Sequence, residues 1–252
     1  MVLFVQLPPF HTTPERLLES VLLSHRWEER SLREHLKNVK NQAMYAVIHG
    51  GIDKDLRQLS SDFLTQLPFD GYAIGGSLGS CHEELVELVA FLVPKLPKDK
   101  PNHLLGIADE RSILAAVPLG DYQTNYYKKY TTYSCKGVIE SFDPSNHSFH
   151  CALFAGIDTF DSCFPTRLAR HGTLLTKAGK LHVSNQKCAT AFGEPICRSC
   201  ACSTCASYDL AYLHHLKKAK EPLLWQLASI HNIHYMNDLM AGLRQQILAN
   251  EI

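Results

Sequence analysis

The chain has 252 residues, of which 45% are hydrophobic and 20% are charged, and its formal net charge is zero. This length fits one large domain or two small ones, and the composition is typical of soluble globular proteins. No apolar run approaches the roughly 18 residues of a membrane helix, and residues 1–6 lack the pattern of a secretory signal. The sequence therefore predicts a cytoplasmic protein without a membrane span. Its zero net charge excludes the class of nucleic-acid-binding proteins that carry an overall basic excess.

Predicted helices and short apolar strands alternate along the chain. The first helix begins at Thr13 and Pro14, because proline is common at the first helical position. The predicted strands cover residues 44–51, 71–76, 103–107 and 156–162, and the predicted helices cover residues 13–37, 53–67, 83–96 and 110–117. This alternation indicates an α/β fold, in which crossover helices join the strands of a parallel sheet.

The strand count leaves two architectures open. If residues 2–3 end a further strand, the chain holds five strands, whereas a closed (β/α)₈ barrel needs eight. An open doubly wound sheet is the alternative, although no GxGxxG motif opens a helix to support its dinucleotide-binding version. Residues 121–155 interrupt the alternation with five Tyr, two Cys and few aliphatic residues. We interpret them as an insertion or a long loop.

Cys200, Cys202 and Cys205 form a compact CxCxxC motif, and 25 residues separate Cys205 from His231. Three thiolates and one imidazole suit tetrahedral zinc, and clustered cysteines in a chain without a secretory signal favour a metal over disulfides. A helical hairpin would return His231 to the cysteines; its helices are predicted at residues 208–219 and 225–239. Because protein would fill all four positions, we expect the zinc to be structural rather than catalytic.

Other residues compete for the ligand positions. Cys197 forms a second CxxC motif with Cys200. The rivals of His231 are His214, His215 and His234. The metal-free alternative is a group of buried thiols near an unrelated histidine.

The cysteine motif and the histidine within SIHNIHYM resemble the zinc subdomain of the tRNA-guanine transglycosylases. Further segments resemble that family in the same order, namely MYAVIHGGIDKDLR, FDGYAIGGSLG, KPNHLLGIA, GIDTFDSCFPTRLARHG and AYLHHL. The similarity covers nearly the whole chain outside residues 121–155. The sequence resembles chlamydial-type members more than the commonest bacterial ones. Several motifs in one order make the resemblance far more specific than any single motif.

The resemblance implies a fold and a reaction. The fold is an incomplete (β/α)₈ barrel of TIM type over residues 1–190, with residues 121–155 as an insertion, followed by a zinc-binding helical subdomain over residues 191–252. In the family, an Asp carboxylate attacks the ribose carbon of a tRNA wobble guanosine and guanine leaves. Queuine or another 7-deazaguanine base then replaces the enzyme on the ribose, which is the two-step logic of covalent catalysis.

Residues at and after the last predicted strand match the family's catalytic and RNA-binding positions. Asp161 falls on the nucleophile, and it follows a strand where barrel enzymes build their active sites. Asp158 lies three residues earlier, so on a regular strand it faces the other side. Arg167 and Arg170 match residues that hold the anticodon, and Arg suits phosphates and base edges. The alternative for either Asp is a strand-end cap, and for either Arg a solvated charge.

The resemblance also places a base pocket on the earlier strands. His49 stands where the family has an amide, the backbone of Gly75 and Gly76 contacts the base, and Leu105 stacks on it. Glycine at a strand end lets a ligand approach the backbone closely, although plain turn chemistry is the alternative. Gly79 falls beside the substituent of the incoming base, where a missing side chain leaves room for the larger queuine.

The chain also departs from the family pattern. The family's first three strands, with the motif that carries its acid–base Asp, have no counterpart, and Val5 replaces a base-binding Asp. We therefore expect little exchange activity from the 252 residues alone. The expected partners are tRNA with a guanine wobble base and a homologous subunit in a homodimer or heterodimer. The alternative function is a non-catalytic, zinc-containing accessory subunit or truncated paralogue that binds tRNA or an intact homologous subunit.

Overall fold

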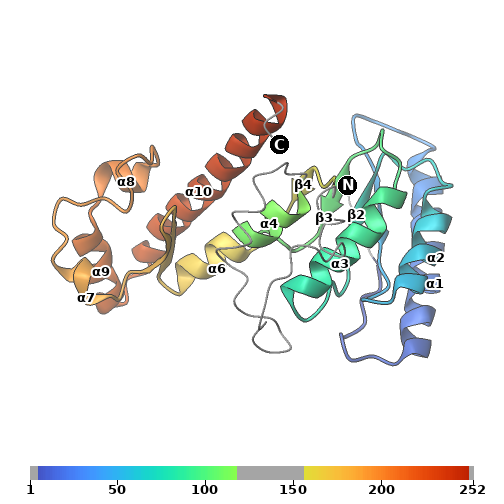
Figure 1. Cartoon of the computed structure of the whole chain (residues 1–252), viewed down its shortest axis with the longest axis horizontal. Coiled ribbons are helices and arrows are strands. Elements are labelled where there is room, and N and C mark those ends of the chain that lie inside the picture. The colour runs from blue at the N-terminus through green and yellow to red at the C-terminus, as the bar shows by residue number, and fades with distance from the viewer. Residues whose placement is uncertain (1–4, 118–155, 250–252) are drawn as a thin grey trace, which may run out of the picture. The chain divides into compact units, whose positions relative to one another are not determined.

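The computed structural model describes residues 5–117 and 156–249. The expected insertion at 121–155 and the strand expected at 2–3 lie outside these residues. The chain forms two compact units, Met1–Asp161 and Ser162–Glu251, whose elements are labelled in Figure 1. The domain boundary that the resemblance implies, at residue 190, stays a prediction. No helix in the described ranges is long and apolar enough to cross a membrane.

The first unit is built on a parallel sheet whose described strands have the order β1-β2-β3-β4. The strands are β1 (Tyr45–Ile48), β2 (Gly71–Ile74), β3 (Asn102–Leu104) and β4 (Thr159–Phe160), and the helices are α1 (Pro14–His35), α2 (Lys54–Leu64), α3 (His82–Leu92), the 3₁₀ turn η1 (Val93–Lys95) and α4 (Glu110–Ala116). Each strand is shorter than the sequence predicts, because the chain turns away as soon as the ladder ends. The predicted α/β fold with a parallel sheet is confirmed.

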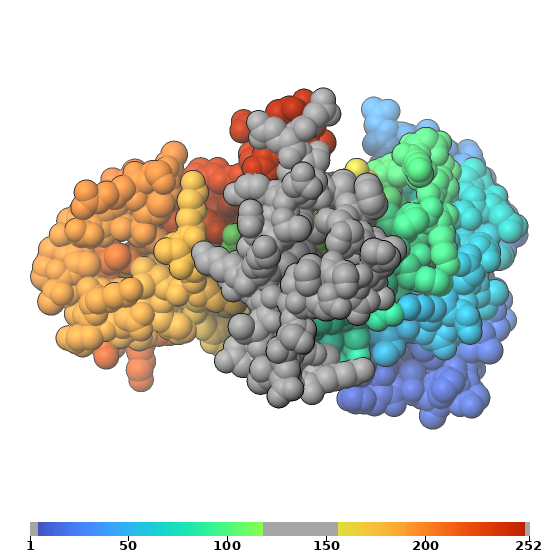
Figure 2. Space-filling model, viewed as in Figure 1, coloured from blue at the N-terminus to red at the C-terminus, as the bar shows by residue number. Residues whose placement is uncertain are grey.

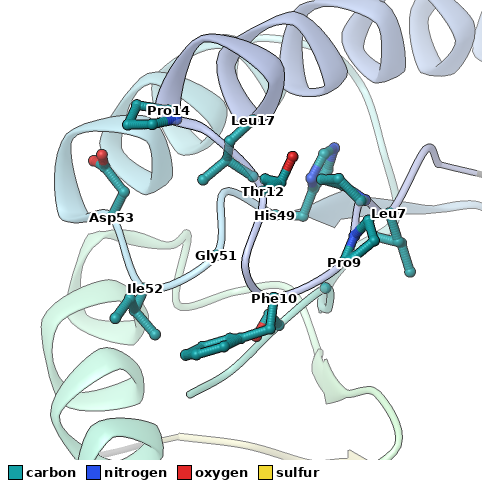
Figure 3. Close-up of a pocket in the computed structure, with 13 residues that line it drawn as sticks. Leu7, Pro9, Phe10, Thr12, Pro14, Leu17, His49, Gly51, Ile52 and Asp53 are labelled. Atoms are coloured by element: carbon teal, nitrogen blue, oxygen red, sulfur yellow. The ribbon is translucent and has the colours of Figure 1, made fainter. Parts of the chain in front are cut away.

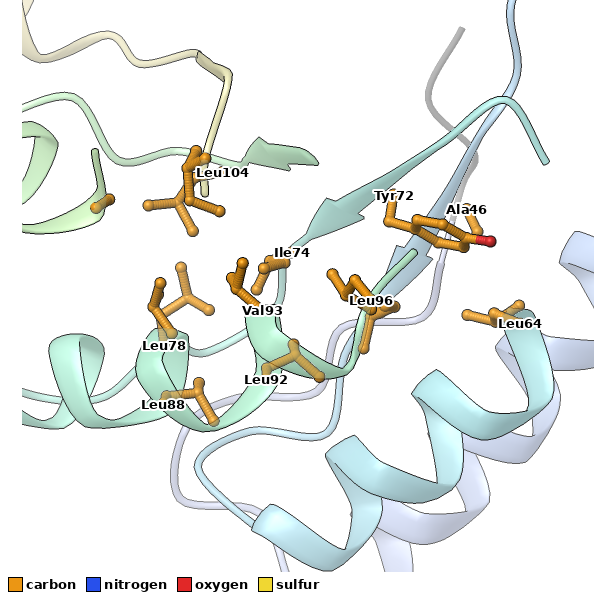
Figure 4. Packing of buried hydrophobic residues seen from close by; sticks show 14 of the residues in the cluster. Ala46, Leu64, Tyr72, Ile74, Leu78, Leu88, Leu92, Val93, Leu96 and Leu104 are labelled. Carbon is orange, nitrogen blue, oxygen red and sulfur yellow. The ribbon is translucent and has the colours of Figure 1, made fainter. Parts of the chain in front are cut away.

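Side chains of the first three strands alternate between the two faces of the sheet. On one face, Ile48, Ile74 and Leu104 are fully buried in one core cluster with residues of α2 and α3. Figure 4 shows Ile74 and Leu104 in this cluster. Leu64 closes this core from α2, and Leu92 closes it from α3. The period of two along each strand therefore leaves the opposite face for the residues between them, which include His103.

Aspartate caps set where the helices α2 and α4 begin. Asp53 accepts hydrogen bonds from the backbone N–H groups of Asp55 and Leu56 at the start of α2. Asp109 accepts one from Ser112 N at the start of α4. Each cap satisfies donors that the first helical turn leaves unpaired. The caps fix the loops that leave the carboxyl ends of β1 and β3.

The second unit combines a β-hairpin with helices. Its elements are α6 (Phe164–Arg170), β5 (Thr173–Thr176), β6 (Gly179–His182), α7 (Gln186–Ala189), α8 (Ser203–Ser207), α9 (Leu210–Ala219) and α10 (Leu223–Leu248). The antiparallel hairpin β5–β6 was not predicted from the sequence. Its core is lined by Leu174, Leu213 and Leu227, among others. Figure 2 shows the surface of this unit in yellow to red, and that of α1 and α2 in blue and cyan.

A buried carboxyl group of α1 contacts strand β1. Glu28 is fully buried, and its Oε2 accepts a hydrogen bond of 2.9 Å from Val47 N. Its Oε1 has no hydrogen-bond partner among the described residues. Burial raises the pKa of Glu28 from 4.5 to about 8, although the bond from Val47 opposes this. The folded protein therefore keeps a proton on Glu28 that the unfolded chain releases near pH 4.5.

This raised pKa makes stability fall with pH. The contribution of neutral Glu28 is complete below pH 4.5 and is lost as the pH rises through about 8. Glu28→Gln keeps an acceptor for Val47 N but does not ionise. From about pH 5.5 to about pH 8.5, its free energy of unfolding should rise relative to the parent by about 2–3 kcal/mol. Urea unfolding at both pH values measures this. The exposed Glu29→Gln is the control, and equal pH dependence of parent and Glu28→Gln would contradict the assignment.

Candidate active site and metal centre

Asp161 follows β4 at the carboxyl edge of the parallel sheet. Its Oδ1 accepts a hydrogen bond of 3.1 Å from Gly106 N and lies 3.0 Å from His103 Nε2. Its side chain is 58% exposed. Within the described residues, Oδ2 accepts no hydrogen bond. The carboxylate is therefore held by one oxygen and open at the other.

Asp158 has a different role at the other end of the same strand. Its Oδ2 accepts a hydrogen bond of 2.7 Å from Asn102 N, and its own N–H donates to Asn102 O at 3.0 Å. Asp70 does the same at the start of β2, where it accepts from Met44 N. Such carboxylates close the amino ends of the strands. Of the two aspartates near β4, only Asp161 lies at the carboxyl edge, where barrel enzymes bind substrate.

A pocket of about 270 Å³ lies at the carboxyl ends of β1 and β2 (Figure 3). Its walls are mostly apolar and come from the segment before α1, from α1 itself and from the loops after the two strands. They include Leu7, Phe10, Leu17, His49, Ile52 and Gly76. Apolar walls with a few polar groups are typical of small-molecule sites.

His49 is the buried polar side chain of this pocket. The residue is 1% exposed, and its Nε2 has no hydrogen-bond partner in the part of the chain that the structure describes. Burial, the charge of Arg57 and then that of His25 together lower the pKa of His49 to about 4. His49 is therefore neutral near pH 7. A neutral imidazole nitrogen without a partner is costly to bury, so a ligand with a matching polar group would satisfy it.

Arg57 holds the two loops of the pocket together. Its guanidinium donates to the carbonyl oxygens of Ile48 at 2.7 Å, Gly51 at 2.8 Å and Ser77 at 3.0 Å. The residue is fully buried, which lowers its pKa to about 9, so it remains protonated near neutral pH. The sequence analysis missed this residue. A signal was present, because Arg57 shares a helical face with Ser60, Ser61 and Leu64, all of which are buried.

The glycines predicted to contact the base have specific surroundings. A Cβ on Gly75 would lie 2.6 Å from Leu105 Cδ1, so this leucine packs directly on the glycine backbone. A Cβ on Gly76 would lie 3.1 Å from His49 Cβ, and its φ of +78° favours glycine. Gly79 has a φ of +112°, and its Cβ would lie 2.6 Å from Glu84 Cβ. Its backbone therefore requires glycine whichever base is bound.

The arginines predicted to bind RNA belong to the second unit. Arg167 and Arg170 lie in α6, and both are exposed. Neither has an ion pair with a described residue. An exposed guanidinium without an ion-pair partner can bind a phosphate group, so both positions suit contacts with an RNA backbone.

The predicted metal ligands come together in the second unit. The ligand atoms of Cys200, Cys202, Cys205 and His231 all lie within 4.8 Å of one another. His231 Nδ1 lies 3.7, 3.6 and 3.3 Å from the three sulfur atoms in that order. Tetrahedral coordination with zinc bond lengths would separate sulfur and nitrogen by about 3.5 Å. The cluster is therefore of the right size for a tetrahedral metal.

Neighbouring groups orient the histidine of this cluster. His231 Nε2 lies 2.8 Å from Leu175 O, so Nε2 carries the proton and Nδ1 presents its lone pair to the sulfurs. Asn232 accepts from Leu175 N and donates to the carbonyls of Pro165 and Thr173. This network attaches α10 to β5 and α6 and fixes the ring before any metal binds.

The rival ligands lie outside the cluster. Cys197 Sγ contacts Ser199 Oγ at 3.2 Å, and His214 Nδ1 contacts Val183 O at 2.8 Å.

Burial raises the pKa of Cys205 to about 12 and also raises that of Cys200. Thiols that burial keeps protonated need a cation to become thiolates, and a bound metal supplies that charge.

Comparison with known proteins agrees with these features. A family model described as queuine tRNA-ribosyltransferase matches residues 1–122 and 144–252. A queuine tRNA-ribosyltransferase of Protochlamydia amoebophila is 46% identical over 97% of this chain and 54% of the relative. Those of Chlamydia caviae and Chlamydia pneumoniae are each 40% identical over 98% of this chain and 57% of the relative. The chain thus spans about half the length of the curated relatives it matches. The predicted family resemblance is confirmed.

The three carbonyl contacts of Arg57 make its replacement destabilising. Arg57→Met preserves much of the side-chain length but leaves the carbonyls of Ile48, Gly51 and Ser77 without this donor. We expect a loss of about 2–4 kcal/mol in the free energy of unfolding. Arg33→Met is the matched control, because Arg33 pairs with Glu29 on the surface and should contribute less than about 0.5 kcal/mol. Urea unfolding measures both, and equal losses would contradict the role of Arg57.

Proposed function

This chain belongs to the queuine tRNA-ribosyltransferase family, and we propose that it exchanges guanine at the wobble position of tRNA for a 7-deazaguanine base. The observation that carries the proposal is the carboxylate of Asp161. It is held through Oδ1 and open at Oδ2, at the sheet edge where the family motif places a nucleophile. The fold that we propose is the C-terminal part of a (β/α)₈ barrel followed by a zinc subdomain.

Asp161 performs the proposed reaction in two displacements. An oxygen of Asp161 forms a bond to the ribose C1′, and the C1′–N9 bond breaks. Guanine leaves with the electron pair of that bond and gains a proton at N9. In the second displacement the incoming base loses its N9 proton, attacks C1′ and releases the carboxylate. The exchange therefore consumes no net proton and needs no redox partner.

The pocket at the ends of β1 and β2 supports the binding of a base. We assign His49, Gly75, Gly76 and Leu105 to base recognition, since the leucine packs on the glycine backbone and the buried imidazole lacks a partner. The φ of +112° at Gly79 favours glycine by itself, and we propose that the missing side chain also leaves room for the larger queuine beside the substituent of the incoming base. The names of the relatives support queuine as the incoming base.

Other contacts of the tRNA and the subunits are part of the same proposal. Arg167 and Arg170 hold the anticodon backbone, and a homologous subunit completes a dimer.

We further propose that the segment at 121–155 contains an insertion relative to the family, because the family match omits residues 123–143. The cysteine–histidine cluster holds a structural Zn²⁺, since three sulfurs and one imidazole suit this ion and leave no position for substrate.

The zinc assignment predicts a metal content that depends on individual cysteines. The purified protein should contain about one zinc per chain, and Cys202→Ser should lose most of it because a hydroxyl is a poor zinc ligand. Cys197→Ser is the matched control and should retain the metal, because Cys197 lies outside the cluster. Elemental analysis of both variants measures this. Full zinc in Cys202→Ser would refute the ligand set.

The nucleophile assignment predicts a covalent adduct with tRNA. We expect little complete base exchange from the 252 residues alone, so the assay follows a single turnover, which detects the covalent adduct itself. With guanine-containing tRNA, Asp161→Asn should abolish the adduct that survives denaturant, because an amide is a poor nucleophile. Asp158→Asn is the comparison, since it alters a carboxylate that caps a strand and should reduce the adduct only as far as it reduces folding. Denaturing gel electrophoresis detects the adduct. Its persistence in Asp161→Asn would end the proposal.

A further inference from the structure

His103 makes the contacts that orient the carboxylate of Asp161. His103 lies opposite Thr159 in the β3–β4 ladder, and its Nδ1 lies 2.8 Å from Thr159 Oγ1. Two residues along the chain from Thr159, Asp161 lies on the same face, and His103 Nε2 lies 3.0 Å from its Oδ1. The ring is thus held between a hydroxyl and a carboxylate, at both of its nitrogens. We propose that His103 is a positioning residue, because its contact with Oδ1 leaves Oδ2 of Asp161 as the attacking oxygen. This inference rests on the proposed function.

The donors and acceptors around the ring select one tautomer. A carboxylate only accepts hydrogen bonds, so His103 Nε2 carries the proton and donates to Asp161. In the neutral ring Nδ1 then accepts, and the hydroxyl of Thr159 donates to it. Both ring nitrogens of His103 and the hydroxyl of Thr159 have a matching partner in this arrangement. A third group that fixes the orientation of the second is the logic of catalytic triads, used here on a carboxylate nucleophile.

Gly106 supplies the second donor to the same oxygen. Its N–H donates to Asp161 Oδ1 at 3.1 Å. Its φ of +74° is a conformation that favours glycine, although a Cβ there would meet nothing within 4 Å. Two donors on one oxygen favour a single orientation of the carboxylate plane. The other oxygen, Oδ2, is then the open one.

Burial separates this arrangement from a surface ion pair. The side chain of His103 is 15% exposed, whereas that of Asp161 is 58% exposed. Across the sheet, the residue that pairs with His103 on β2 is Ala73, which is buried and uncharged. The rigid partner is thus the imidazole and the exposed partner is the reacting group, as a positioning role requires.

The imidazole spectrum tests the arrangement independently of activity. Long-range ¹H–¹⁵N correlation on the full chain should show the neutral form of His103 as the Nε2–H tautomer. Thr159→Val and Asp161→Ala should each shift its ring nitrogens. Thr173→Val is the matched control, because Thr173 contacts another ring, His182, and it should leave the signals of His103 unchanged. An Nδ1–H tautomer, or His103 signals that neither variant moves, would overturn the proposal.

The rate of adduct formation tests whether the contact of His103 with Asp161 speeds the attack of the carboxylate on the ribose. With saturating tRNA, His103→Leu should slow adduct formation about ten- to hundredfold, since small misplacements of a reacting group cost this much. His103→Gln places an amide N–H at a similar reach and should restore the rate to within about threefold of the parent. Equal rates in all three proteins, or equal losses in both variants, would overturn the proposal. A parent protein without any adduct would refute the proposed function instead, and the spectrum would still decide the pairing.

Discussion

The guanidinium of Arg57 is the group on which the shape of the pocket at the carboxyl ends of β1 and β2 depends. The loops after β1 and β2 each present backbone carbonyls to the interior, and a buried carbonyl without a donor is costly. One side chain from α2 satisfies three of them, at Ile48, Gly51 and Ser77. The two loops therefore keep a fixed separation, and His49 and Gly76 face the pocket between them. The burial of His49 lowers the pKa of its ring most, and the charge of Arg57 lowers it as well.

The second unit depends on a comparable arrangement around His231. One ring nitrogen faces three sulfurs, and the other donates to the backbone of β5. Asn232 then joins the same strand to α6. A metal bound by this cluster would be coupled to the packing of the hairpin β5–β6, because the same helix supplies the histidine of the cluster and the hydrogen bonds. Free energy of metal binding contributes directly to the stability of such a unit.

Two aspartates near β4 show how position decides the role of one residue type. Asp158 accepts a backbone N–H at the amino end of the sheet, so its carboxylate is used for structure. Asp161 lies at the carboxyl end, where strands of a parallel sheet give way to loops and the side chain reaches solvent. Its contacts with His103 and Gly106 use one oxygen alone. The division agrees with the general separation of stability and chemistry between the two ends of such sheets.

The sequence by itself determined the features that are local in the chain. Alternating periods predict the helices and strands of the first unit, and the CxCxxC spacing predicts the metal cluster. The family motifs single out Asp161. Only the tertiary structure decided which distant groups meet. It chose His231 over His214, paired His103 with an aspartate 58 residues away, and gave Arg57 its three carbonyls. The physical reason is that periodicity and capping act within a few residues, whereas these contacts depend on the register of strands and the packing of helices.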